Sequence, residues 1–278
     1  MTAWLDGALV PLEQARVSVL DHGLVVGDGV FETLRVYRGV PFAWSRHLAR
    51  LRVSAGGLGL GVPADEHLRA AADAVLEAND LREARLRITV TGGPGPPGSG
   101  KGSAPATVFL LAFPIEPPAP TTDVVIAPWT RNEHGALAGL KTISYAANVR
   151  ALAYAREHGA GEAIFANTRR NLCEATGSNV FLVRDSTLCT PPASAGCLLG
   201  VTRALVLELC KDLGIVAVER DVELGALAGA DEAFLSSTTR EVQPIAHVDG
   251  EALAAAPGPV STQLTAAFKD LVARELDP

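Results

Sequence analysis

The chain has 278 residues, which is enough for two ordinary domains that each have a hydrophobic core. Its net charge of −7 and pI of about 5.4 argue against a nucleic-acid-binding surface. No apolar run approaches the ~18 residues that a membrane helix needs, and residues 1–14 lack the basic start and apolar run of a secretory signal, so we expect none. Because the four cysteines and six histidines show no metal-binding spacing, we expect reduced thiols, a cytoplasmic protein and no metal site.

The first half of the chain predicts an α+β domain. Residues 2–12 and 29–42 have the alternation and turn residues of two β-hairpins, with turns at Asp6-Gly7 and Arg38-Gly39. Apolar residues at helical spacing predict helices over 45–60 and 64–80. Residues 84–92 and 106–113 predict two strands on either side of a glycine-rich loop.

A proline-rich segment predicts the boundary between two domains. Residues 114–123, PIEPPAPTTD, hold four prolines, and we place an N-terminal α+β domain at 1–116, a linker at 117–123 and a C-terminal domain at 124–278. In the second domain the sequence predicts strands over 124–129, 162–168, 179–185, 217–222 and 231–238. Helices are predicted over 147–159, 202–214 and 260–276, which makes this an α/β-type domain.

The glycine-rich loop TGGPGPPGSGKGS, residues 91–103, is similar in spacing to a phosphate-binding loop. Such a loop needs a Ser or Thr after its lysine and a helix that begins there. Here Gly102 follows Lys101, and the chain continues into a predicted strand. We therefore interpret the loop as a mobile connection between strands, of a kind that often covers an active site.

The chain has four lysines, and their surroundings separate them. Lys211 and Lys269 lie on the polar faces of predicted helices, and Lys101 lies in the loop. Lys141, in GLKTISYAANV, precedes an amphipathic helix in an apolar neighbourhood with few countercharges. Desolvation lowers the pKa of a lysine and frees its amine, so Lys141 is the favoured chemical lysine.

Six segments in order resemble the class IV aminotransferases, the fold-type IV pyridoxal-phosphate enzymes. They are DHGLVVGDGVFETLRVYRG, RHLARLRVSA, GLKTISYAANV, NLCEATGSNVFLV, GCLLGVTRALV and DEAFLSSTTREVQPI. The resemblance implies a smaller N-terminal α+β domain and a larger C-terminal domain with a pseudo-barrel sheet. It also implies pyridoxal 5′-phosphate bound between the domains, and a homodimer in which N-terminal loops of one subunit close the site of the other.

The resemblance assigns a role to particular residues. Lys141 would be the catalytic lysine, joined to the cofactor aldehyde as an imine. Glu174 would lie beside the ring nitrogen and keep it protonated. The expected phosphate ligands are Arg50, Thr238, and Val201 and Thr202 at a helix N-terminus. Leu198 would pack on the ring, and Tyr145 either hydrogen-bonds the ring oxygen or only packs.

The positions that distinguish members of this family point to different members in this chain. D-amino acid transaminases have VTRG and a tyrosine where this chain has Gly92 and Phe31, so their carboxylate clamp is missing. Branched-chain enzymes have a tyrosine and a glycine where this chain has Val26 and Thr33. Thr33 and KTISYAANV resemble 4-amino-4-deoxychorismate lyases, although these usually keep an arginine near position 92.

The substrate carboxylate still needs a cation or an amide. The sequence offers Arg240, Arg38, Arg131 and the backbone amide of Thr239, and we expect Phe31, Thr33, Thr239 and Arg240 to line the substrate site.

We therefore predict a transaminase that moves an amino group between an amino acid or primary amine and a 2-oxo acid, with a D-amino acid or (R)-amine favoured as the donor. The alternative within the family is a 4-amino-4-deoxychorismate lyase that releases 4-aminobenzoate and pyruvate. Outside the family, the alternatives are a nucleotide-binding protein that uses the glycine loop, and a binding module without catalysis.

Overall fold

A computed structural model describes all residues, 1–278, and divides the chain into two compact units. Unit 1 consists of Met1–Glu116, Leu140–Ser144 and Glu275–Pro278, and unit 2 of Pro117–Gly139 and Tyr145–Arg274. The short segment that contains Lys141 thus belongs to unit 1, although it lies well beyond the proline-rich segment in the sequence.

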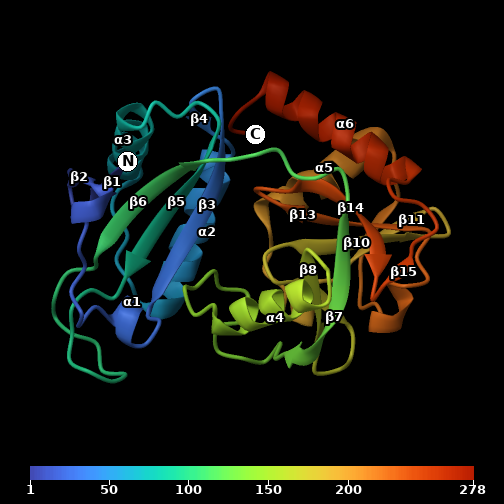
Figure 1. Ribbon diagram of the computed structural model, residues 1–278, viewed down its shortest axis with the longest axis horizontal. Helices are drawn as coiled ribbons and strands as arrows, with labels where there is room; N and C mark the ends of the chain where they lie inside the picture. Colours follow the sequence, from blue (N-terminus) through green and yellow to red (C-terminus); the bar gives the residue numbers. More distant parts are fainter. The chain divides into compact units, whose positions relative to one another are not determined.

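Unit 1 is built on an antiparallel six-stranded sheet in the order β2-β1-β6-β5-β3-β4 (Figure 1). The strands are β1 Thr2–Leu5, β2 Ala8–Pro11, β3 Gly29–Tyr37, β4 Val40–Pro41, β5 Ala84–Thr91 and β6 Val108–Pro114. Both predicted hairpins form. The first turns at Asp6 and Gly7, where φ is 45° and 102°.

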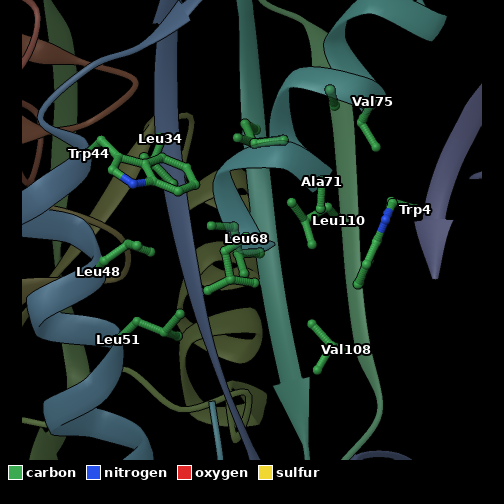
Figure 2. Packing of buried hydrophobic residues seen from close by; sticks show 14 of the residues in the cluster. Trp4, Leu34, Trp44, Leu48, Leu51, Leu68, Ala71, Val75, Val108 and Leu110 are labelled. Atoms are coloured by element: carbon green, nitrogen blue, oxygen red, sulfur yellow. The ribbon is translucent and has the colours of Figure 1, made fainter. Parts of the chain in front are cut away.

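Helices cover one face of this sheet. These helices are α2 Trp44–Leu58, which contacts β3, and α3 Asp65–Ala78, which contacts β1 and β6. The short helix α1 His22–Val25 precedes β3, and a 3₁₀ turn η1 lies at Leu12–Gln14. Figure 2 shows the core: Leu34 of β3 lies beside Trp44 and Leu48 of α2, while Leu68 and Val75 come from α3. Because side chains alternate along a strand, Phe31 and Thr33 of β3 project from the opposite face of the sheet.

The glycine-rich loop joins β5 to β6, both of them strands, so it lacks the helix of a phosphate-binding loop. Contacts inside unit 1 anchor it. His22 Nε2 lies 2.9 Å from the carbonyl oxygen of Pro96, and Lys101 Nζ contacts the carbonyl oxygen of Leu58 at the end of α2. Lys101 Nζ also lies 3.7 Å from the carboxylate of Asp28.

Unit 2 contains a nine-stranded mixed sheet in the order β12-β11-β10-β13-β14-β7-β8-β9, with β15 paired to β14. The strands are β7 Thr122–Arg131, β8 Glu162–Asn167, β9 Leu172–Ala175, β10 Asn179–Arg184, β11 Thr187–Thr190, β12 Ala217–Glu219, β13 Glu232–Ser237, β14 Glu241–Val248 and β15 Glu251–Ala252. Strand β9, at one end of this order, also contacts β10, so the sheet curls into a pseudo-barrel.

Three helices pack on the curled sheet: α4 Ala146–Glu157, α5 Val201–Leu213 and α6 Pro259–Arg274, with 3₁₀ turns η2 Ala193–Ala195 and η3 Leu224–Ala226. Helix α4 buries Ala151 and Ala155 against β7 and β8, and α5 contacts α6. None of the helices combines the length and the apolar character that crossing a membrane requires. No group of three or more His, Cys, Asp or Glu side chains is arranged to hold a metal ion.

Candidate active site

The backbone around Lys141 is fixed on two sides within unit 1. The amide of Phe31 donates to the carbonyl oxygen of Lys141 at 3.1 Å, and the amide of Ile143 donates to Gly29 at 2.9 Å, so the segment pairs with the start of β3. On the other side, the Lys141 amide donates to the buried Ser54 hydroxyl of α2 at 3.0 Å. These three bonds place Lys141 next to β3 and α2.

Glycine makes room for this segment. A Cβ at Gly29 would lie 2.7 Å from Cδ1 of Ile143 and 2.9 Å from the carbonyl oxygen of Val90, both closer than van der Waals contact. Gly27 has a φ of +72°, and a Cβ there would lie 2.7 Å from Oγ of Ser144. The glycines of GDG, which the resemblance singled out only as part of a motif, therefore have a steric reason.

Two cations lie over the ring of Phe31, which is 5% exposed. Lys141 Nζ lies 4.4 Å from the ring centroid, and the guanidinium carbon of Arg87 lies 3.7 Å from it. Nε of Arg87 also donates to the Thr89 hydroxyl at 3.2 Å. Sequence reasoning missed Arg87, although its position in β5, between Leu86 and Ile88 of the core, indicated that it faces away from the helices.

Arg50 of α2 is paired with a carboxylate. Nε and Nη2 of Arg50 lie 2.7 and 2.8 Å from the two oxygens of Glu32, which is fully buried. Nδ1 of His47, 2% exposed, lies 2.7 Å from the same carboxylate. Arg50 was predicted from the resemblance, whereas Glu32 and His47 were missed.

The protonation states of this cluster follow from its burial and charges. Burial raises the pKa of Glu32, but the charges and hydrogen bonds of Arg50 and His47 outweigh it and lower that pKa to about 2. Burial lowers the pKa of His47; the carboxylate of Glu32 opposes this shift, and the positive charges of Arg50 and Lys141 add to it. At neutral pH, Glu32 is therefore an anion that accepts hydrogen bonds from Arg50 and from a neutral His47.

In unit 2, the carboxylate of Glu174 on β9 contacts a backbone amide and an arginine. Its carboxylate accepts the Leu198 amide at 2.9 Å and lies 3.4 Å from Nε of Arg131. Burial and, to a smaller extent, the charge of Glu174 raise the pKa of Cys197 to about 12, so this neighbouring thiol stays neutral. Arg131 stacks 4.5 Å from the ring centroid of Phe165, which orients its guanidinium toward Glu174.

The N-terminus of α5 presents amides without a side-chain cap. Gly200 is the N-cap residue, and a Cβ there would collide with Asn179. Val201 and Thr202 are buried in the first turn. Two serine hydroxyls nearby are buried without a hydrogen-bond partner. Ser178 directly precedes Asn179, the first residue of β10, and Ser236 of β13 is paired with Asn179. Buried helix amides and hydroxyls of this kind suit an anion.

The remaining predicted residues lie in unit 2. Tyr145 is the N-cap residue of α4. Thr238, Thr239 and Arg240 form the turn between β13 and β14. Arg240 donates to Gln243 and to the carbonyl oxygen of Gly161, and it lies 3.5 Å from Glu162, so its guanidinium holds this turn to β8.

The comparisons with known proteins are consistent with this arrangement. The profile of the family described as Amino-transferase class IV matches residues 29–248. A putative branched-chain-amino-acid aminotransferase of Methanocaldococcus jannaschii is 35% identical, with 98% of this chain and 96% of the relative covered. A D-alanine aminotransferase of Bacillus licheniformis is 31% identical, with 99% and 98% covered.

Solved structures of aminotransferases also match this chain over nearly its whole length. The branched-chain aminotransferase of Thermoproteus uzoniensis with norvaline has a TM-score of 0.90 and 32% identity, covering 98% of this chain and 94% of that one. A branched-chain amino acid aminotransferase solved with pyridoxamine 5′-phosphate has a TM-score of 0.92. The chain belongs to the class IV aminotransferase family. It is an enzyme of the fold-type IV class, and its cofactor is pyridoxal 5′-phosphate, which confirms the predicted family, fold class and cofactor.

The residues present fit that cofactor. A phosphate suits the uncapped, buried N-terminus of α5 and the unpartnered serine hydroxyls near it. A protonated ring nitrogen suits the carboxylate of Glu174, and an aldehyde suits the amine of Lys141. The predicted residues divide between the units: Lys141, Phe31, Thr33 and Arg50 belong to unit 1, and the others to unit 2.

Proposed function

We propose that this aminotransferase moves an amino group between an amino acid or a primary amine and a 2-oxo acid, with Lys141 as the catalytic residue. The observation that carries the proposal is the amine of Lys141 over the Phe31 ring, on a backbone fixed by β3 and α2. A lysine so fixed presents its amine repeatedly at one face of a reacting carbon.

Each residue that holds the cofactor has a separate role in this proposal. Pyridoxal phosphate, when bound, withdraws electrons from the substrate Cα. In this proposal Lys141 Nζ would take the proton from the substrate Cα and deliver it, on the same face, to C4′ of the cofactor, so that the amino group stays on the cofactor carbon. Glu174, oriented by Arg131, keeps the ring nitrogen protonated, and Leu198 packs on the ring. Tyr145 hydrogen-bonds the ring oxygen.

The phosphate group would bind several donors at once. They are the amides of Val201 and Thr202, the hydroxyls of Thr202 and Thr238, and the guanidinium of Arg50. A guanidinium has five N–H donors in a planar fork, so Arg50 can bind Glu32 with one edge and a phosphate with another.

For the substrate carboxylate we propose the amide of Thr239 and the cation of Arg87. Arg87 shares the Phe31 ring with Lys141, so a bound carboxylate there would lie close to the reacting amine. Arg240 already has three partners in the turn that carries Thr239, and we assign it to positioning this turn. Phe31 and Thr33 complete the substrate side.

A D-amino acid or (R)-amine remains our proposed donor, because Val26 replaces the tyrosine of the branched-chain enzymes. The relatives named above include both a branched-chain and a D-alanine aminotransferase, so they do not decide between donors. A Cβ at Gly92 would lie 2.5 Å from an oxygen of Asp28. The carboxylate of Asp28, which lies 3.7 Å from Lys101 Nζ, therefore fills the space beside Gly92 from which the arginine clamp would project.

We also propose a homodimer. Residues 17–26 carry six large apolar side chains that are at least 41% exposed: Val17, Val19, Leu20, Leu24, Val25 and Val26. Monomers rarely expose such a contiguous patch, and a second copy of the chain would bury it.

The test is a spectral half-reaction of the cofactor-loaded enzyme. A D-amino acid, a branched-chain L-amino acid, an (R)-amine and aminodeoxychorismate are added separately, and absorbance follows conversion to pyridoxamine phosphate. We expect conversion with the D-amino acid or (R)-amine, and a loss of about 10³-fold in Lys141→Ala but not in the control Lys269→Ala. Pyruvate release from aminodeoxychorismate, without conversion by any donor, would establish the lyase instead.

A further inference from the structure

A fully buried carboxylate ties Arg50 to the core of unit 1. Glu32 projects from β3 on the same face as the buried Val30 and Leu34, and its partner position on β5 is the buried Ile88. Leaving a carboxylate in such a place without partners is strongly destabilising, so its position requires a cation. Both of its oxygens are within 2.8 Å of a nitrogen of Arg50.

The pairing is bidentate, which fixes the plane of the guanidinium as well as its position. Side chains as long as Arg50 otherwise sample many rotamers, and an anion that binds them must select one. His47 adds a third hydrogen bond to the same carboxylate and lies one helical turn before Arg50 on α2. Glu32, His47 and Arg50 thus form one hydrogen-bonded cluster, in which each side chain fixes the position of the next.

We infer that Glu32, held by His47, is a positioning residue that presets the Arg50 guanidinium for the cofactor phosphate. This inference rests on the proposed role of Arg50 as a phosphate ligand. Neither Glu32 nor His47 needs to touch the cofactor: the effect passes through the orientation of Arg50, whose guanidinium then binds the phosphate without a further ordering cost.

The test compares two ligands that differ only in the phosphate group. Binding of pyridoxal phosphate and of phosphate-free pyridoxal is measured by absorbance for the wild type, Glu32→Gln, Arg50→Ala and the double variant. We expect Glu32→Gln to raise the Kd of pyridoxal phosphate about 10-fold and to leave that of pyridoxal unchanged. In the Arg50→Ala background, Glu32→Gln should have no further effect, because the two residues act as one unit.

Two further variants separate positioning from folding. His47→Leu removes the hydrogen bond to Glu32 and should weaken pyridoxal phosphate binding several-fold, whereas His47→Asn can return a donor near Nδ1 and should restore it. The control is Asp73→Asn, which breaks an exposed ion pair with Arg69 on α3.

The outcomes are distinct. Equal losses for both ligands, or additive effects of Glu32→Gln and Arg50→Ala, would overturn the inference and leave Glu32 as a structural residue. If the wild type binds pyridoxal phosphate no better than pyridoxal, the proposed phosphate site itself fails. A wild type that prefers pyridoxal phosphate but loses nothing on Arg50→Ala would reject Arg50 as a phosphate ligand, and the positioning role with it.

Discussion

At the scale of single residues, the proposed reaction depends on charged side chains, and each unit shows which partners they contact. Lys141 could be chosen from the sequence because only four lysines compete, and the other three have polar surroundings. Glu32 could have been found in the same way. It shares the face of Leu34 and Val36 in an alternating strand, and a carboxylate on a core face requires a cation.

The buried carboxylate predicts how stability depends on pH. The pKa of Glu32 is lowered to about 2 in the folded protein, so its ionised form stabilises the fold above its unfolded pKa of 4.5. That contribution is lost as the pH falls from about 4.5 towards 2, and it is on the order of 3 kcal/mol. Urea unfolding of the apoprotein between pH 7 and 3 should therefore show a steeper loss for the wild type than for Glu32→Gln. Parallel curves for the two proteins would contradict this assignment.

At the scale of elements, most helices and strands follow from periodicity, and the exceptions have physical reasons. Helices α2 to α6 match their predicted ranges to within a few residues. Strand β14 was missed because Pro244 and polar residues interrupt its alternation, and β9 and β11 because they are only four residues long. Strand β7 begins at Thr122, inside the predicted linker, because its first residues pair with β14.

The docking of the lysine segment on β3 gives a prediction at this scale. Gly29→Ala places a methyl group against the Val90 carbonyl and Ile143, so either the strand or the segment must move. We expect a loss of about 1–3 kcal/mol in the free energy of unfolding and weaker cofactor binding. Calorimetry and cofactor titration measure these effects. Gly61→Ala is the matched control, since a Cβ there meets nothing within 4 Å; an unchanged melting temperature in Gly29→Ala would show that the segment is not held as described.

At the scale of the whole molecule, the compact units are not continuous stretches of the sequence. The proline-rich segment contains the junction between Glu116 and Pro117. No local pattern indicates that residues 140–144 join the first unit, because their partners Gly29, Phe31 and Ser54 are more than eighty residues away in the sequence. The domain roles, the predicted site residues and a cytoplasmic location stay predictions.

The exposed apolar patch of residues 17–26 predicts the assembly. Sedimentation should find a homodimer, and Val19→Lys combined with Leu24→Lys should give monomers, since both side chains are more than 60% exposed and would be buried in an interface. Val216→Lys, at a similarly exposed valine, is the control. A wild type that sediments as an active monomer would reject the dimer.

The most direct test of the central claim is to find which lysine binds the cofactor. The protein loaded with pyridoxal phosphate is reduced with borohydride, digested and analysed by mass spectrometry. We predict a yellow protein that bleaches on reduction and carries the phosphopyridoxyl mass on Lys141, with no label in that position in Lys141→Ala. A stoichiometric label on Lys101, Lys211 or Lys269 with Lys141 unmodified, or a colourless protein that takes no label, would contradict it.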